Sequence, residues 1–515
     1  MNQTPKKTGS PGGSALKMGV FTLAMINVSA IVSLRGLPAE STYGLSSAFY
    51  YIFAAIFFLI PVSLVAAELT TGWPQKGGVF RWVGEAFGTR FGFLAIWLQW
   101  IESTIWFPTV LTFAAVSIAF VGPNQSWDEA VSANDYYVLI MVLLVYWAAT
   151  LLNFRGMSMS GAITKWGTLI GTVIPAALLV LMGLVYWASG NALDISMAPG
   201  EFFPDLTNFN NIVLAASIFL FYAGMEMSAV HVKDVDNPGR NYPKAIFIAS
   251  VMTVAIFVLG TLAIGFIIPE SQINLVQSLL VAFDKFFAYF EVPWLGPAMA
   301  VCLAFGVLAQ VVAWVGGPSK GLLQVGCAGY LPPFMQKTNK RGVQVGILLL
   351  QGGVVTLLSI FFVVLPSVQT AYQIISQLTI ILYLIMYLLM FAAGIYLRYR
   401  EPDTPRSFRI PGGKFGMWLV GGLGLLGSVI AFVLSFVPPS QIPVGSPAVY
   451  VGILIVGMLV FAGIPFIIYA MRRPEWADPR SVAEFEPFGW EKAGRGGASA
   501  ASSHHASQNT DSSEQ

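Results

Sequence analysis

Apolar residues recur along this chain in long runs, separated by short segments rich in Gly, Pro and charged residues. An α-helix needs about 20 apolar residues to cross the roughly 30 Å hydrocarbon core of a membrane. The runs are too long and too evenly apolar for the alternating strands of a membrane barrel. The pattern therefore predicts an all-α polytopic membrane protein with twelve transmembrane helices. The predicted helices lie at residues 17–36, 46–70, 90–121, 136–153, 160–187, 210–232, 244–268, 294–317, 343–365, 368–397, 415–437 and 446–471.

The amino-acid composition argues against several classes of function. Of 515 residues, 56% are hydrophobic and 10% are charged, whereas soluble domains contain about 25% charged residues. Cys302 and Cys327 both lie in or beside apolar runs, which predicts structural thiols rather than a disulfide framework. The histidines are His231, His504 and His505, and no GxxxxGK[ST] loop occurs. We therefore expect no enzyme, ATP-driven pump, metal site, cofactor or nucleic-acid partner.

Lysine and arginine are unevenly distributed between the two sides of the predicted membrane. All 27 of them except Arg35 and Lys285 fall on the side that holds both termini, whereas the opposite segments carry mainly Asp and Glu. Basic residues favour the cytoplasmic side of membrane proteins. This predicts that residues 1–16 form a cytoplasmic segment and that residues 17–473 form the transmembrane domain. Residues 474–515, rich in Gly, Ala and Ser, are predicted to be a disordered cytoplasmic tail.

Two of the predicted helices contain residues that interrupt a helix. Ser33, Gly36 and Pro38 surround Arg35 in the first helix, and Gly224 lies close to Glu226 in the sixth. Helices one and six are equivalent if the chain is an inverted repeat of five plus five helices followed by two more. Interrupted helices at equivalent positions commonly line the substrate site of transporters. Close helix packing is the alternative explanation for the glycines.

Charged residues inside a membrane are energetically costly and are therefore candidates for function. Arg35, Glu102 and Glu226 lie deepest in their helices. A purely structural ion pair among them is the alternative, but the planar guanidinium of Arg35 could instead bind a carboxylate. Glu68 and Lys165 lie near the cytoplasmic ends of their helices, where snorkelling or pairing with a loop explains them.

Aromatic side chains form a further candidate group. Trp314 lies in the eighth predicted helix, and Tyr383 and Tyr387 lie four residues apart on one face of the tenth. Packing or anchoring at the membrane interface is the ordinary explanation for such residues.

Several segments resemble bacterial glutamate/GABA antiporters of the amino acid/polyamine/organocation superfamily. The longest is GMEMSAVHVKDVDNPGRNYPKA at residues 224–245, and others in the same order lie at 58–69, 77–83, 305–321 and 407–414. The resemblance implies the inverted repeat of five plus five helices and a bacterial inner-membrane location. It also implies that Glu226, Trp314, Tyr383 and Tyr387 are substrate-site residues.

The chain departs from this family at three positions in the expected site. Arg35 stands where the family has a tyrosine, Gln310 where it has a glutamate, and Glu102 where it has a glutamine. The site has therefore gained a cation and relocated an acid, which leaves the substrate pair open. The predicted substrate-binding residues are Ser33, Arg35, Gly36, Tyr222, Gly224, Glu226, Gln310, Trp314, Tyr383 and Tyr387, with Glu102 as a secondary candidate.

These features predict a secondary active amino-acid antiporter that works by alternating access. It would exchange an external glutamate-like amino acid for an internal amino acid or its decarboxylated, GABA-like product. Protons are potential further partners beside the substrates and the lipid bilayer. A proton- or sodium-coupled symporter and a membrane sensor without transport activity remain alternatives. The resemblance also implies a C-terminal tail that blocks the cytoplasmic opening. The tail of this chain around His504 and His505 is of low complexity, however, which favours disorder.

Overall fold

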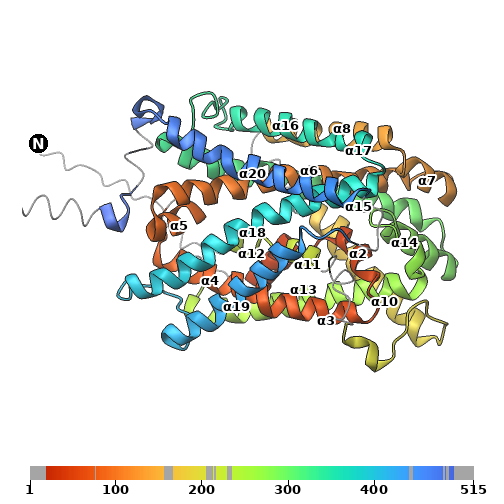
Figure 1. Cartoon of the computed structure of the whole chain (residues 1–515). Coiled ribbons are helices and arrows are strands. Elements are labelled where there is room, and N and C mark those ends of the chain that lie inside the picture. Colours follow the sequence, from red (N-terminus) through yellow and green to blue (C-terminus); the bar gives the residue numbers. More distant parts are fainter. Residues whose placement is uncertain are drawn as a thin grey trace, which may run out of the picture.

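The computed structural model is built from helices (Figure 1). It describes residues 19–75, 77–155, 166–204, 216–228, 235–439, 445–479 and 486–491, together with residues 213 and 482. Within these residues, ten helical segments are long and apolar enough to cross a membrane. They are formed by α3 (Ser46–Ala54), η2 (Ala55–Leu59) and α4 (Ile60–Gly72) as one segment, α6 (Thr89–Ala119), α8 (Asp135–Phe154), η3 (Leu169–Val173) with α10 (Ile174–Ala188), α13 (Pro238–Ile267), α15 (Leu295–Val325) with η8 (Gly326–Tyr330), α16 (Val345–Ser359) with α17 (Phe361–Val364), α18 (Val368–Arg400), α19 (Gly413–Leu434) and α20 (Pro447–Met471).

The first predicted helix is interrupted in the structure. Helix α1 (Val20–Ile31) ends before two extended residues, and the 3-10 turn η1 (Leu34–Gly36) and helix α2 (Leu37–Ser41) follow them. Pro38 lies in the first turn of α2, where its missing N–H group leaves no helical hydrogen bond unmade. The interruption predicted around Arg35 is therefore confirmed.

The sixth predicted helix is also interrupted. Helix α11 (Ala216–Tyr222) is followed by a turn at residues 223–224 and by the short helix α12 (Met225–Ser228). Gly224 adopts a φ of 109°, which a residue with a Cβ atom rarely adopts. The turn that ends α11 therefore requires a glycine at this position. The second predicted interruption is confirmed.

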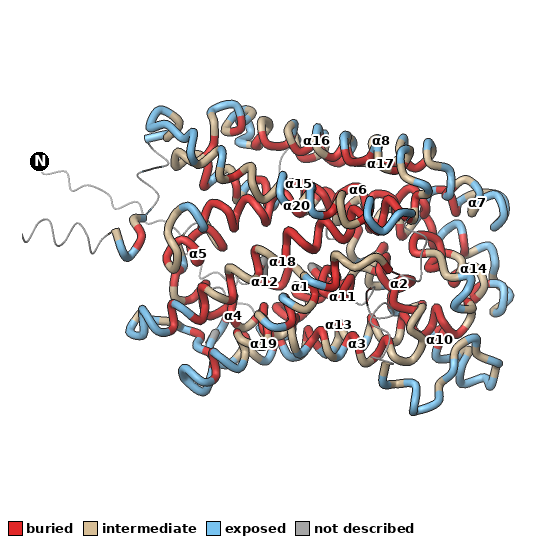
Figure 2. The backbone as a smooth tube through the Cα atoms, in the orientation of Figure 1, coloured by how far each residue is buried: buried red, intermediate tan, exposed pale blue. Residues whose placement is uncertain are grey.

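Helices α6 and α18 pack against each other and are mostly buried, whereas most of α20 is not buried (Figure 2). Trp100 and Phe107 of α6 and Tyr387 of α18 are fully buried. In contrast, Val456 and Leu459 of α20 are 61% and 63% exposed. Exposed apolar side chains at such density are expected where a helix faces lipid.

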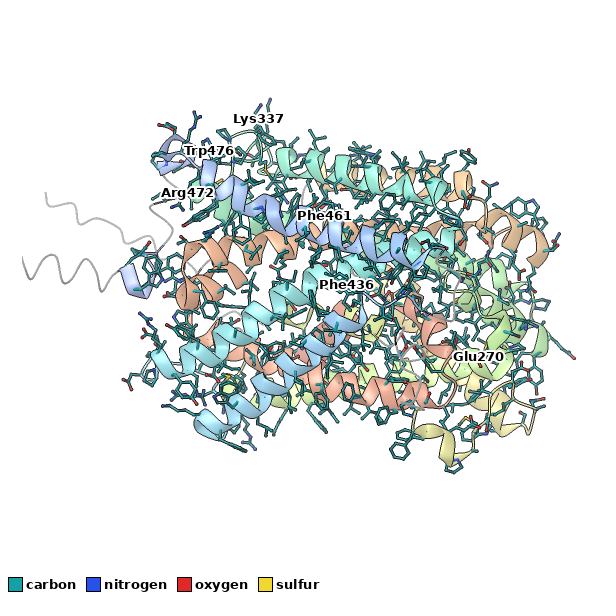
Figure 3. The ribbon with its side chains drawn as sticks, viewed as in Figure 1. Glu270, Lys337, Phe436, Phe461, Arg472 and Trp476 are labelled. Carbon is teal, nitrogen blue, oxygen red and sulfur yellow. The ribbon has the colours of Figure 1, made fainter. Side chains whose placement is uncertain are left out.

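Shorter helices connect the long ones. These are α5 (Val79–Phe87), α7 (Gln125–Ser132) and α14 (Ser278–Tyr289), with 3-10 turns at η4 (Pro199–Phe202), η7 (Glu270–Gln272) and η9 (Pro474–Trp476). Figure 3 shows Lys337, Arg472 and Trp476 at one end of the molecule and Glu270 near the other. The long helices therefore hold the basic segments and this acidic turn far apart.

Glu68, near the end of α4, is paired with Arg398 in the last turn of α18 and with the loop that follows α18, in agreement with the loop pairing considered for its position. Its carboxylate accepts hydrogen bonds from Arg398, from Arg406 at 3.1 Å and from the backbone N–H of Ile410 at 2.8 Å. Lys165 lies outside the described residues.

The start of the tail differs from the predicted disorder. The backbone N–H of Asp478 donates to the carbonyl of Cys327, and residues 486–491 pack on α5. Aromatic residues in this polar stretch supply the packing, and Phe488 is 3% exposed. Residues 1–16, His231 and the end of the tail with His504 and His505 lie outside the described residues.

Candidate functional site

A small cavity lies where the two interrupted helices meet. Its volume is about 40 Å³, which holds a few water molecules, whereas cavities that enclose small ligands measure about 300–1,000 Å³. An amino acid therefore fits only if the surrounding side chains move. The lining residues are Ile31, Ser33, Arg35, Glu102, Ser103, Trp106, Leu220, Phe221, Ala223, Gln310, Trp314 and Tyr383. The structure thus brings together six of the predicted residues, namely Ser33, Arg35, Glu102, Gln310, Trp314 and Tyr383.

Arg35 reaches this cavity from η1, in the first interruption. Its Nη1 donates to Thr109 Oγ1 at 3.3 Å and to the Tyr372 hydroxyl at 3.1 Å. Its guanidinium lies 5.4 Å from the ring centre of Trp106 and 5.3 Å from that of Phe221. Neutral hydrogen bonds and aromatic rings therefore orient the guanidinium without neutralising its charge.

Glu102 brings an acid to the same cavity from α6. The side chain is 2% exposed, and its Oε1 atom has no hydrogen-bond partner. The Nε atom of Arg35 is likewise buried without a partner. In the part of the chain that the structure describes, no ion pair involves Arg35, Glu102 or Glu226. The structural ion pair considered among these residues is thus not formed, and a guanidinium group and a carboxyl group without ion-pair partners face one cavity.

Glu226 is held by the tyrosine pair of α18. The hydroxyls of Tyr383 and Tyr387 donate to its two carboxylate oxygens at 2.5 Å each, and Gln99 Nε2 donates at 3.3 Å. The backbone N–H of Gly224 donates to the Tyr387 hydroxyl at 2.8 Å. The two tyrosine rings stack with centres 4.6 Å apart. These bonds fasten the second interruption to α18.

A larger cavity of about 310 Å³ lies next to Glu226. Glu226 and Gln99 line it, together with Trp73 and Trp82 and with residues of α15 such as Pro318. Because Tyr383 lines the small cavity and Glu226 the large one, their hydrogen bond lies where the two cavities approach each other.

The remaining predicted residues have packing roles of different kinds. A Cβ atom on Gly36 would come within 2.2 Å of the Phe221 ring, so only glycine allows the two interruptions to approach this closely. Tyr222 does not line either cavity. Its ring stacks on Phe257 with centres 5.7 Å apart, and its hydroxyl donates to the Tyr51 carbonyl. The geometry gives no support to a binding role for Tyr222.

The sequence interpretation missed a face of α6. Gln99, Ser103 and Trp106 all line a cavity, and Thr109 holds Arg35. These residues are three or four positions apart and therefore share one helical face with Glu102, a spacing that could have revealed them.

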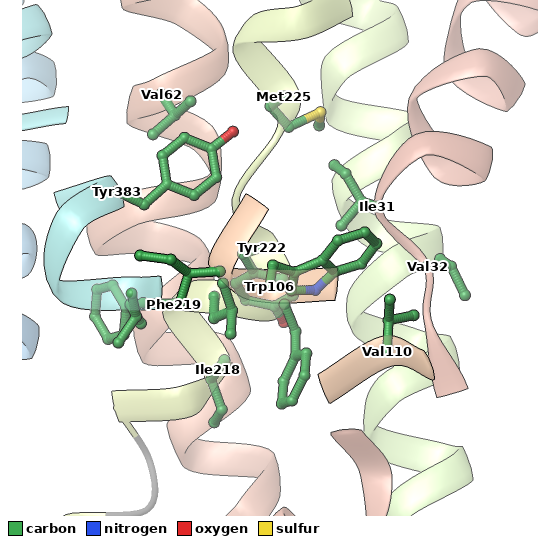
Figure 4. Close-up of a cluster of buried hydrophobic side chains, with 14 of the residues drawn as sticks. Ile31, Val32, Val62, Trp106, Val110, Ile218, Phe219, Tyr222, Met225 and Tyr383 are labelled. Carbon is green, nitrogen blue, oxygen red and sulfur yellow. The ribbon is translucent and has the colours of Figure 1, made fainter. Parts of the chain in front are cut away.

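Tyr372 could have been found in the same way. It precedes Tyr383 by eleven residues, about three helical turns, and so faces the same side of α18. Figure 4 shows Trp106 between Tyr383 and the end of α1 at Ile31 and Val32. In the described ranges, no group of three or more His, Cys, Asp and Glu side chains is placed to hold a metal ion.

Known proteins similar to this chain are membrane transporters. A model of the amino acid permease family matches residues 18–461. An uncharacterized transporter of Legionella pneumophila is 40% identical over 451 residues, which cover 87% of this chain and 96% of that protein. A glutamate/gamma-aminobutyrate antiporter of Lactococcus lactis is 30% identical over 460 residues, covering 88% of this chain and 90% of that protein. A probable agmatine/putrescine antiporter of Lactococcus lactis is 23% identical over 427 residues, covering 82% and 88%.

The family match extends from the first helix into the last, and therefore includes both interruptions and every residue of the two cavities. The similarity to the Lactococcus antiporters also covers nearly the whole chain. It agrees with the resemblance seen in the segments around Glu226 and Trp314. The chain therefore belongs to the amino acid permease family of the amino acid/polyamine/organocation superfamily, whose members include glutamate/GABA antiporters homologous to it.

Proposed function

We propose that this protein is a secondary active amino-acid antiporter of a bacterial inner membrane. It exchanges an external, glutamate-like amino acid for an internal amino acid or for its decarboxylated amine. The observation that carries the proposal is a pair of buried ionisable side chains, Arg35 and Glu102, which line one cavity at two helix interruptions and each have a polar atom without a hydrogen-bond partner. Ionisable side chains are costly in a membrane and are retained where they serve a function, here by meeting the charged groups of a substrate.

The proposed architecture has twelve helices, with both termini in the cytoplasm. Ten continuous spans plus the two interrupted segments make this number. The interrupted segments occupy the first and sixth positions, which supports an inverted repeat of five plus five helices followed by α19 and α20. The distribution of Lys and Arg supports the orientation.

In the proposed site, the substrate lies between the two interruptions. Its carboxylate contacts the Arg35 guanidinium and the N–H groups at the start of η1, because a helical N-terminus carries partial positive charge. Its ammonium group contacts Glu102 or Glu226 and the carbonyl groups at the end of α11. Trp106, Trp314 and Tyr383 move to enlarge the cavity.

The two cavities support a mechanism of alternating access. The large cavity is lined by residues 73–75 and 77–79, next to the segments assigned to the cytoplasm. The bonds of Tyr383 and Tyr387 to Glu226 separate that cavity from the substrate. Rocking of the first, second, sixth and seventh helices against the third, fourth, eighth and ninth breaks these bonds and connects the site with the cytoplasm.

Counterflow into proteoliposomes tests the proposal. Labelled glutamate should accumulate in vesicles preloaded with glutamate or GABA and not in empty vesicles, and Arg35→Ala should abolish accumulation. Uptake into empty vesicles driven by a proton or sodium gradient would instead identify a symporter. Specific binding of an amino acid without any flux would identify a sensor. A competition screen of amino acids and their amines, including agmatine and putrescine, defines the substrate pair.

A further inference from the structure

Another buried acid, Glu40, lies outside the substrate cavity and was not suggested by the sequence. It belongs to α2, just beyond the first interruption, and its side chain is 0% exposed. The hydroxyl of Ser217 in α11 donates to its Oε1 atom, whereas its Oε2 atom has no hydrogen-bond partner. One carboxyl group therefore joins the half-helix that follows the first interruption to the half-helix that precedes the second.

The groups that face Glu40 do not supply a donor for the second oxygen. Tyr51 of α3 and Tyr222 of α11 lie close enough to interact with it electrostatically. However, the Tyr222 hydroxyl donates to the Tyr51 carbonyl at 3.2 Å, and the Tyr51 hydroxyl is bonded to Thr261 of α13 at 3.0 Å. Both hydroxyls are thus engaged elsewhere.

The helices that pack on α2 do not supply a cation either. Where helix α13 packs on α2, it presents the uncharged Gly260. This glycine lies so close to Leu37 that a Cβ atom at its position would contact the leucine side chain. Helix α14 carries Asp284 and Lys285, and Lys285 donates to the carbonyl of Ile267 at 3.1 Å. Over the residues that the structure describes, no ion pair involves Glu40.

An ionised carboxylate in this position would be buried with a single donor and without a counter-ion. The free-energy penalty of such a charge is large, and buried groups of this kind neutralise instead. In an exposed environment the same carboxyl ionises at pH values above about 4. The docked arrangement of α2 on α11 therefore takes up a proton from neutral solution.

We propose that Glu40 is a proton-binding site that couples the contact between α2 and α11 to protonation. When the carboxyl is neutral, the two half-helices dock as in this structure. When it loses its proton, the buried charge draws in water and the half-helices separate, which opens the substrate cavity on that side. Protons are thereby a second species whose binding is linked to the transport cycle, at a site distinct from Arg35 and Glu102.

The first test measures proton binding without transport. The Tm of the purified full-length protein is recorded from pH 5 to 9 for the wild type, Glu40→Gln and the control Glu270→Gln, which changes an exposed acid. The wild type and the control should lose stability relative to Glu40→Gln as the pH rises, by up to about tenfold in the folding equilibrium per pH unit. Equal pH dependence of the wild type and Glu40→Gln would overturn the proposal.

The second test measures transport in proteoliposomes that contain a pH-sensitive dye. Exchange by the wild type should change the internal pH, whereas Glu40→Gln should exchange substrate with a pH change at least tenfold smaller per substrate. If Glu40→Gln does not fold, Ser217→Ala serves instead. It retains the carboxyl and should shift the pH midpoint of exchange, and an unshifted midpoint contradicts the proposal. Should the wild type exchange no substrate, the proposed antiport fails, while the Tm measurement still tests Glu40.

Discussion

The hydroxyl of Tyr383 lies 2.5 Å from Oε1 of Glu226 and donates a hydrogen bond to it. This bond joins a continuous helix to an interrupted one, at the boundary between the small and the large cavity. Hydrogen bonds to charged groups contribute about 1.5–3 kcal/mol each. Formation or loss of this single hydrogen bond is therefore sufficient to change the equilibrium between two arrangements of the interrupted helix by a factor of ten or more.

Removal of the tyrosine hydroxyls should slow transport. Tyr383→Phe and Tyr387→Phe each delete one bond to Glu226, and Tyr387→Phe also leaves the Gly224 N–H without its acceptor. We expect at least a tenfold lower rate of counterflow for each variant, because the second interruption loses its position against α18. Tyr136→Phe, at an exposed position of α8, is the matched control. Wild-type rates in both α18 variants would show that these hydrogen bonds do not control the connection between the two cavities.

Conservative changes at Arg35 and Glu102 should change selectivity in opposite directions. Arg35→Lys keeps the charge but loses the geometry that bonds Thr109 and Tyr372. It should weaken inhibition by carboxylate-containing substrates about tenfold, close to the 1.4 kcal/mol of one weakened charged contact. Glu102→Gln should instead weaken inhibition by amines that lack a carboxylate. Competition curves against labelled substrate measure both effects. Parallel losses for acids and amines in each variant would mean that the two side chains do not bind opposite ends of the substrate.

The interruptions could be predicted because their causes are local. Gly224 adopts a backbone conformation that requires glycine, and Pro38 begins a new helix. The ten continuous spans could also be predicted, because apolar length is the property that a membrane demands of a helix. The sequence pattern and the family resemblance place Arg35, Glu102 and Gln310 in one site, and the three residues do line one cavity.

What the sequence could not reveal depends on contacts between distant segments. Tyr222 follows the α-helical pattern of its neighbours, yet its rotation about α11 directs it to Phe257 and away from the cavity. Glu40 lies in a short polar segment that resembles a loop, and only the packing of α2 buries it. The aromatic residues near the C-terminus are surrounded by disorder-promoting residues, and their docking on α5 depends on partners about 400 positions away.

Asp284 should make the stability of the protein depend on pH. It lies on α14, between transmembrane helices, and burial together with the neighbouring Asp128 and Glu129 raises its pKa from 3.8 to about 7. Because the folded state holds this proton more tightly than the unfolded state, the contribution of Asp284 to stability is full below about pH 4. It is lost as the pH rises through about 7.

Asp284→Asn cannot ionise and should therefore stabilise the protein at pH 8 by about 1 kcal/mol, after allowance for the partial solvent exposure of the side chain. At pH 4 the variant and the wild type should be alike. The Tm at both pH values checks this, with the exposed Asp403→Asn as control. A variant that is destabilised at pH 8 would show that the ionised carboxylate has a favourable partner.

The segment at residues 486–491 should separate from α5 when its aromatic anchor is removed. Phe488 packs against Phe80 with ring centres 5.7 Å apart, and the guanidinium of Arg81 lies 4.5 Å from its ring centre. Arg81 also donates to the carbonyls of Glu486 and Pro487 at 2.6 and 2.9 Å, and Glu85 accepts from the Gly489 N–H. Phe488→Ala removes the buried ring and exposes these polar contacts to water, which weakens them in turn.

Truncation of a buried phenylalanine typically destabilises by about 3–5 kcal/mol, which exceeds what the remaining hydrogen bonds of a six-residue segment supply. We therefore expect limited proteolysis after residue 479 to accelerate at least tenfold in Phe488→Ala, and amide exchange at Gly489 to rise similarly. Phe334→Ala, at an exposed position, should change neither rate. Because Val79 and Trp82 of α5 line the large cavity, release of the segment should also raise the rate of exchange. Faster proteolysis with unchanged exchange would mean that the segment stabilises α5 without restricting access to the cavity.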